Sequence, residues 1–301
     1  MKETNDVQTL TLAAPPSLPS VLARGALLSP LKRGARSSGA PGMRLVLPGV
    51  RVDGARLAAY ERVCGFAAGR DQALPVTYPH VLGFPLAMRL MAARDFPLPL
   101  LGLVHTSIEI DQRRALGPAE EYELAVYLDD LAPHRRGTEA VMVTEVRVGG
   151  EVVWESRSRY LARHRTGAAD ASDAPRDRSA EPARKPLPAV AEWTLGGDVG
   201  RRYGAASGDR NPIHLYPLTA RLFGFPRAIA HGMWTVARCL AQHGVPQAAR
   251  IHAEFKAPVL LPGTVTYAAE GSAFELRGGG HGAGEDRIHV TGEVLALDGP
   301  S

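Results

Sequence analysis

The sequence predicts an α+β protein built from two halves of similar layout. Residues 164–186 are polar, charged and proline-bearing, without a periodic apolar pattern, which is typical of a linker. On either side, residues 43–163 and 187–297 run in the same order: a short helical stretch, a loop with proline, an apolar helical segment and several alternating strands. Helices followed by antiparallel strands, twice in one chain, indicate two similar α+β domains.

Glycines mark the ends of the expected helices. The helices are predicted at residues 55–64, 82–92, 199–207 and 232–243. Gly65, Gly208 and Gly244 follow three of them directly, and glycine is the favoured residue just past a helix end.

Alternating, β-branched segments predict the strands. They are expected at residues 103–110, 121–128, 140–148, 152–161, 250–257, 264–269 and 288–297. Hairpin turns are expected at Gly149-Gly150 and across residues 278–284.

Residues 1–42 are rich in Pro, Gly, Ser and Ala, which predicts a flexible N-terminal arm. The alternative is a short helix in which Leu27, Leu28 and Leu31 pack against the body.

The composition indicates a globular protein without nucleic-acid or membrane motifs. Of its 301 residues, 45% are hydrophobic and 22% charged, and the formal net charge is +4. The arginines are dispersed and no nucleic-acid-binding motif occurs, so we expect no nucleic-acid partner. No apolar run reaches membrane-spanning length. Cys64 and Cys239 do not form a disulfide framework, which together with the lack of a secretory signal predicts a cytoplasmic protein.

One loop carries residues suited to acid–base chemistry. It holds Asp209 and His214, with Asn211 and Pro212 between them. A residue before proline is held extended, so the geometry of the loop is restricted and the two side chains can converge. Rigid convergence of a carboxylate and an imidazole is what a general acid–base pair requires.

The start of the last apolar helix offers a donor for a developing negative charge. Gly232 follows His231 at that start, and the first N–H groups of a helix have no acceptor within it. Taken singly, these residues also suit ordinary roles: Asp209 an Asx turn, His214 and His231 hydrogen-bonded loop positions, Gly232 a crowded helix start.

Two other chemistries use the same residues. Ser207, Asp209 and His214 could form a hydrolase triad, but no G-x-S-x-G pattern surrounds Ser207. Asp209, His214 and His231 could bind a metal ion, but their spacing matches no standard ligand motif.

The segment 203–233 resembles the hydratase motif of the MaoC-like family, which includes (R)-specific enoyl-CoA hydratases and 3-hydroxyacyl-thioester dehydratases. The matching residues are Tyr203, Ser207, Gly208, Asp209, Asn211, Pro212, Ile213, His214, Ala220, Gly224, Phe225, Ile229, Ala230, His231, Gly232 and Met233. Phe255, Pro258, Val259, Pro262 and Gly263 resemble the strand and turn that follow in that family.

The resemblance implies a double hot-dog fold, in which each repeat wraps an antiparallel sheet around a central helix. The first half resembles the N-terminal repeat through residues 74–91, 96–105 and 153–163, and it has no Asp–Asn-Pro–His loop. We therefore expect catalysis in the second repeat, with the first shaping the acyl tunnel.

The resemblance also implies the reaction: reversible hydration of trans-2-enoyl thioesters to (3R)-hydroxyacyl thioesters, without a cofactor. Asp209 and His214 are the implied dyad, and the Gly232 N–H the implied oxyanion donor. Groups expected to touch substrate or support these three are Tyr203, Ser207, Asn211, His231 and Met233. The thioester carrier is coenzyme A or an acyl carrier protein, and the protein a monomer or homodimer. A hot-dog thioesterase and a non-catalytic acyl-thioester-binding subunit remain the alternatives.

Overall fold

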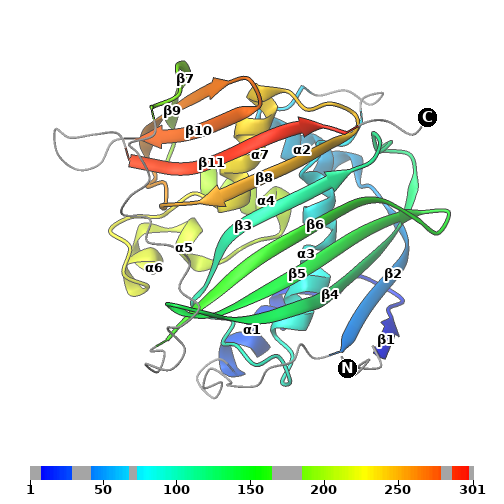
Figure 1. Cartoon of the computed structure of the whole chain (residues 1–301). Helices are drawn as coiled ribbons and strands as arrows, with labels where there is room; N and C mark the ends of the chain where they lie inside the picture. Colours follow the sequence, from blue (N-terminus) through cyan, green and yellow to red (C-terminus); the bar gives the residue numbers. More distant parts are fainter. Residues whose placement is uncertain (1–7, 29–41, 68–72, 165–184, 279–286, 298–301) are drawn as a thin grey trace.

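The computed structural model describes residues 8–28, 42–67, 73–164, 185–278 and 287–297. Its strands form one 11-stranded sheet in the order β1-β2-β4-β5-β6-β3-β8-β11-β10-β9-β7 (Figure 1). The strands of the N-terminal half are β1 (Gln8–Thr11), β2 (Met43–Arg51), β3 (Leu103–Gln112), β4 (Glu121–His134), β5 (Gly137–Val148) and β6 (Glu151–Arg163). Those of the C-terminal half are β7 (Ala189–Leu195), β8 (Ala249–Phe255), β9 (Gly263–Glu270), β10 (Ala273–Gly278) and β11 (Arg287–Ala296).

The sheet consists of two repeats that meet at one seam. β3 pairs antiparallel with β8 there, from Ser107 opposite Glu254 to Gln112 opposite Ala249. Outward from the seam, β6, β5, β4 and β2 follow on one side, and β11, β10, β9 and β7 follow on the other. Chain order and spatial order therefore correspond in the two halves, as the predicted duplication requires.

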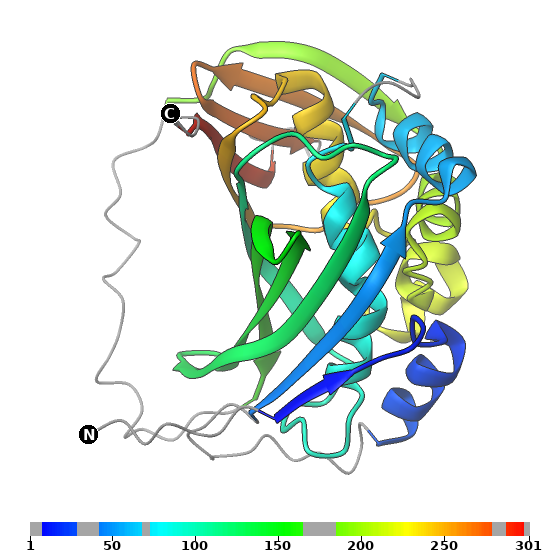
Figure 2. The ribbon, with the colours of Figure 1, turned by 90° about the vertical axis from the view of Figure 1, so that its right-hand side faces the viewer.

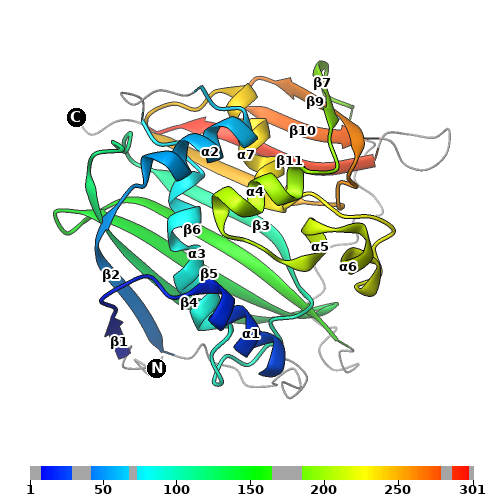
Figure 3. The same cartoon turned by 180° about the vertical axis from the view of Figure 1, so that it is seen from behind.

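Each half of the sheet curves around one apolar helix. These are α3 (Tyr78–Met91) in the first repeat and α7 (Gly232–His243) in the second. α2 (Gly54–Cys64) and α4 (Val199–Ser207) cover them on the side away from the sheet (Figures 2 and 3). This arrangement confirms the double hot-dog fold.

The helix ends follow local capping chemistry. The Asp53 side chain accepts hydrogen bonds from the N–H groups of Ala55 and Arg56 at the start of α2. Gly65 and Gly208 end α2 and α4 with φ of 80° and 85°, the left-handed region that glycine adopts without steric cost. The predicted bounds of α4 and α7 are confirmed.

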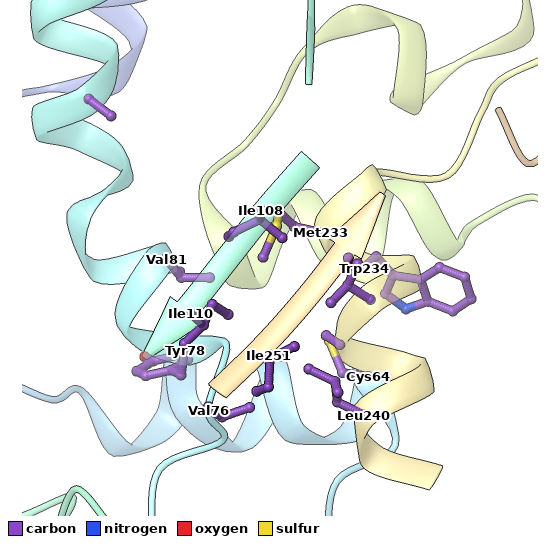
Figure 4. Packing of buried hydrophobic residues seen from close by; sticks show 14 of the residues in the cluster. Cys64, Val76, Tyr78, Val81, Ile108, Ile110, Met233, Trp234, Leu240 and Ile251 are labelled. Atoms are coloured by element: carbon purple, nitrogen blue, oxygen red, sulfur yellow. The ribbon is translucent and has the colours of Figure 1, made fainter. Parts of the chain in front are cut away.

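The two repeats share one hydrophobic core. The Trp234 indole on α7 donates a hydrogen bond of 2.8 Å to the Val63 carbonyl on α2. Figure 4 shows the buried side chains that pack where the repeats meet, among them Cys64, Val76, Tyr78, Val81, Ile108, Ile110, Met233, Trp234, Leu240 and Ile251. Cys64 and Cys239 are both buried free thiols. No helix within the described ranges is long and apolar enough to cross a membrane.

The prediction of a flexible arm is wrong for residues 8–28. β1 pairs with β2 in parallel, and α1 (Leu18–Leu28) packs near α3, where Gly25 fits closely against the Leu100 and Ala92 side chains. Both contacts are made with distant parts of the chain, which composition does not encode. The alternative, a short helix, is confirmed for the backbone up to Leu28. The packing that it predicted for the side chains of Leu27, Leu28 and Leu31 lies outside the described residues.

Other differences concern element bounds. The sequence prediction omits β1, β2, β7 and β10. It also starts α3 too late, because Pro79 occupies the first turn of that helix, where proline is tolerated. Gly149 and Gly150 form the predicted turn, with φ of 58° and 87°. Most of the expected linker and of the 278–284 turn falls outside the described residues, so the linker and the domain boundaries stay predictions.

Candidate active site

The 208–214 loop leaves the end of α4 and is held by its own side chains. The Asp209 Oδ1 accepts a hydrogen bond of 3.1 Å from the Asn211 N–H. Asn211 has φ −57° and ψ 125°, and it caps the short helix α5 (Pro212–Leu215) by accepting from the Ile213 N–H. The extended Asn211 before Pro212 is as predicted, and it turns the chain so that His214 faces back toward Asp209.

His214 is fixed in one tautomer. Its Nδ1 lies 2.8 Å from the Ile229 carbonyl oxygen, which can only accept, so Nδ1 carries the proton. Nε2 is therefore the unprotonated nitrogen and is available to accept a hydrogen bond. Burial lowers the pKa of His214, which keeps the ring neutral near pH 7.

His231 joins the start of α7 to this loop. Its ring stacks on that of His214, with centroids 3.7 Å apart and an interplanar angle of 28°. Its Nε2 donates a hydrogen bond of 2.9 Å to the Asp209 backbone carbonyl. Burial, and next the proximity of His214, lower the pKa of His231 to about 3, so its 3.9 Å approach to Asp209 Oδ2 is not an ion pair at neutral pH.

The three predicted polar residues thus converge. Asp209, His214 and His231 each present an atom within 4.8 Å of the others. His214 and His231 are 8% and 2% exposed, whereas the Asp209 side chain is 29% exposed. The carboxylate is the member of the group that solvent reaches, and the imidazoles stand behind it.

Gly232 occupies a position where a side chain does not fit. A Cβ at Gly232 would lie 2.9 Å from Cε1 of the Phe255 ring. His231 is the N-cap of α7, so the Gly232 N–H belongs to the first turn, whose N–H groups have no acceptor within the helix. This N–H therefore has no acceptor within the helix that competes with a ligand.

The remaining predicted residues support the group or the core. The Tyr203 ring lies 4.8 Å from the His231 ring, and Met233 is buried in the core. Ser207 Oγ accepts a hydrogen bond of 3.2 Å from the Asp209 N–H and is 3% exposed. A serine held inward by the loop backbone is poorly placed as a nucleophile, which argues against the hydrolase triad.

Arg56 is a site residue that the sequence did not reveal. From α2 of the first repeat, its Nε and Nη2 donate hydrogen bonds of 2.7 Å each to the carbonyls of Ala206 and Ser207 at the end of α4. Carbonyls at a helix end receive no hydrogen bond from within the helix, and the helix dipole favours a positive guanidinium at that end. The first repeat thus anchors the chain just before Asp209.

A second histidine group lies on the first-repeat side of the site. His80 on α3 and His105 on β3 have ring centroids 6.1 Å apart, and His105 also lies 4.8 Å from Phe255, the residue beside Gly232. Burial lowers the pKa of His80 to about 4, while the Asp209 charge opposes this shift. The Asp209 charge thus acts across the boundary between the repeats.

The stacked rings of His214 and His231 are poorly arranged to bind one metal ion. Hydrogen bonds already occupy Nδ1 of His214 and Nε2 of His231. A metal ion lies in the plane of each imidazole that binds it, so two stacked rings cannot both direct a lone pair at one ion without turning. The geometry favours acid–base chemistry by Asp209 and His214 over coordination.

Comparison with known proteins places the chain in a family. A family model described as MaoC like domain matches residues 179–291. The 3-hydroxyacyl-thioester dehydratase X of Mycobacterium tuberculosis is 37% identical over 239 residues, which are 78% of this chain and 83% of that protein. The chain belongs to the MaoC-like family.

Solved structures agree with this assignment. The crystal structure of HtdX from Mycobacterium tuberculosis is 33% identical, covers 84% of this chain and 100% of its own, and has a TM-score of 0.71. A second Mycobacterium tuberculosis protein, described as a double hot-dog fold, covers 83% of this MaoC-like chain and 94% of its own with 14% identity and a TM-score of 0.51, a likeness of fold alone.

Proposed function

We propose that this chain catalyses the reversible hydration of trans-2-enoyl thioesters and the dehydration of (3R)-hydroxyacyl thioesters in fatty-acid metabolism. The observation that carries the proposal is the convergence, within 4.8 Å, of the Asp209 carboxylate and a ring nitrogen of His214, whose Nε2 is unprotonated. Similarity to a protein named 3-hydroxyacyl-thioester dehydratase supports the same reaction class.

In the hydration direction, Asp209 and His214 hold one water molecule through its two hydrogens. Asp209 accepts one proton as the water oxygen adds to Cβ of the enoyl group. Nε2 of His214 accepts the hydrogen bond from the second hydrogen and orients the oxygen, which keeps that hydrogen as the new hydroxyl group. The protonated Asp209 then gives its proton to Cα on the same face, which restores the carboxylate. Each such group contributes on the order of 10²–10⁴ in rate.

The Gly232 N–H stabilises the charge that develops on the thioester oxygen. Support comes from its place in the first turn of α7, whose N–H groups have no acceptor within the helix. Loss of one such donor costs on the order of 10²–10³ in kcat.

The substrate is a thioester of coenzyme A or of an acyl carrier protein. Residues of both repeats surround the site within one chain, so no second copy is needed to complete it. Catalysis requires no metal or cofactor in this scheme. The two buried free thiols support a place in the cytoplasm.

Thioester hydrolysis is the competing reaction, and product analysis separates the two. The protein is incubated with a trans-2-enoyl-CoA, and the products are followed by mass spectrometry and chiral chromatography. Formation of the (3R)-hydroxyacyl-CoA with the thioester intact is expected. Free acid and free coenzyme A would establish a thioesterase, and binding without either product would establish a non-catalytic subunit.

A further inference from the structure

Large apolar side chains gather on the surface directly after the 208–214 loop. They belong to α6 (Pro217–Leu222) and its two flanking residues. Tyr216, Leu218, Leu222 and Phe223 are 53%, 71%, 79% and 45% exposed. Apolar residues exposed singly are common on protein surfaces, whereas four that lie together mark an interaction site. We call these four residues the α6 surface.

Positive charge accompanies the α6 surface. Two arginines border it, Arg201 and Arg221. The Arg201 guanidinium lies 5.4 Å from the centre of the Tyr216 ring and donates a hydrogen bond of 3.0 Å to the Leu215 carbonyl. Arg221 lies on α6 itself and is exposed. The surface therefore combines apolar and cationic groups.

Hydrogen bonds connect α6 and the segment after it to the 208–214 loop. Thr219 Oγ1 on α6 donates a hydrogen bond of 2.6 Å to the Pro212 carbonyl, and the Ile229 N–H donates one of 3.2 Å to the Ile213 carbonyl. Figures 1 and 3 show α5 and α6 together at one edge of the molecule. A partner docked on α6 thus contacts an element that is hydrogen-bonded to the loop carrying Asp209 and His214.

We infer that the α6 surface docks an acidic acyl carrier protein, which delivers the thioester to Asp209 and His214; this rests on the proposed function. An acidic amphipathic helix complements both the arginines and the apolar residues. A second copy of this chain paired by two-fold symmetry would bring this positively charged surface against a copy of itself. Coenzyme A could use the arginines through its phosphates, but it leaves Leu218 and Leu222 without a partner.

Kinetics with one acyl group on two carriers test the docking. The substrates are a trans-2-enoyl group on an acyl carrier protein and the same group on coenzyme A. Leu222→Asp places a like charge at the centre of the contact, and Val190→Asp, at another exposed apolar position on β7, is the matched control. L222D is expected to lower kcat/KM for the protein-bound substrate about tenfold or more. Its kcat/KM for the coenzyme A substrate, and both values for V190D, should stay within about twofold of wild type.

Several results would overturn the docking. They are a wild type that hydrates the coenzyme A substrate but not the protein-bound one, an equal loss of both by L222D, and no effect of L222D on either. The first of these leaves the proposed hydration intact.

A binding measurement decides the docking independently of turnover. Isothermal titration of wild type with the holo acyl carrier protein, carrying its phosphopantetheine arm without an acyl group, should show binding that L222D weakens and V190D does not. No binding, or equal binding by L222D, would overturn the inference. A wild-type dimer in sedimentation that L222D dissociates would assign the surface to a second copy.

Discussion

The imidazole rings of His214 and His231 stack 3.7 Å apart. Their outer hydrogen bonds run to the backbone, from His214 to Ile229 and from His231 to Asp209. The stack therefore links the 208–214 loop to the start of α7, and it holds Asp209, His214 and the Gly232 N–H in one unit.

His231 should act by positioning Asp209. His231→Phe keeps a ring against His214 but removes the hydrogen bond to the Asp209 carbonyl. A net hydrogen bond contributes about 1 kcal/mol, so we expect kcat to fall roughly five- to tenfold. His231→Gln, which can still donate, should retain more activity than H231F. Steady-state kinetics check this, and a larger change in KM than in kcat, or a better H231F than H231Q, would contradict it.

Gly232→Ala should lower activity and stability because the added methyl group contacts Phe255; the backbone N–H itself is kept. The added methyl group would lie 2.9 Å from the ring, so activity and melting temperature should both drop. In the double variant Gly232→Ala, Phe255→Leu the ring is gone, and part of both losses should return. Activity assays and thermal unfolding of the single and double variants test this. If the double variant recovers neither activity nor melting temperature, the losses arise at the helix start and not from contact with Phe255.

Arg56 should influence a reaction to which it contributes no reacting group. Arg56→Ala removes both hydrogen bonds to the end of α4, and we expect kcat to fall about tenfold while the sheet stays folded. Arg56→Lys keeps the charge but not the paired donors, so its kcat should lie between those of wild type and Arg56→Ala. Arg62, which is exposed on the same helix, provides the matched control as Arg62→Ala. Kinetics unchanged in R56A would disprove the anchoring role.

Acid should destabilise the fold through its buried histidines. Burial lowers the pKa of His80 to about 4 and that of His231 to about 3, from an unfolded value of 6.5. Only the unfolded chain binds these protons between pH 6.5 and the folded values. Stability is therefore complete above pH 6.5 and falls as pH decreases, by up to about 1.4 kcal/mol per pH unit for each histidine.

Urea unfolding between pH 7.5 and pH 4.5 checks this sign. His80→Gln should make the fall in the free energy of unfolding shallower. His252 has the opposite shift, because the hydrogen bond that it donates to the Glu254 carboxylate raises its pKa. His252→Gln should therefore make the fall steeper. A stability that rises on acidification would contradict the burial of His80 and His231 in their neutral forms.

Local signals in the sequence account for what could be predicted. Gly208 and Gly244 end α4 and α7 through backbone conformations that the residue type itself favours, so those bounds were predictable. Asn211 before Pro212 fixed the loop in the same local way. The duplication was visible because the order of elements repeats along the chain.

Contacts between distant residues account for what could not be predicted. Arg56 bonds to Ala206 and Ser207 across 150 residues, and no local pattern marks it. β1 owes its strand conformation to β2, and the stacking of His231 on His214 depends on the packing of α7. The resemblance supplied the dyad and Gly232, but not the residues of the first repeat that surround them.

The most direct measurement is the ultraviolet absorbance of an enoyl thioester in the presence of wild type, Asp209→Asn and Asp198→Asn. Asp198, exposed at the start of α4, is the matched control. We predict that wild type and D198N remove the absorbance without releasing free thiol, and that D209N slows this on the order of 10²–10⁴. Equal rates for D209N and wild type, or thiol released in step with the lost absorbance, would contradict hydration by Asp209 and His214.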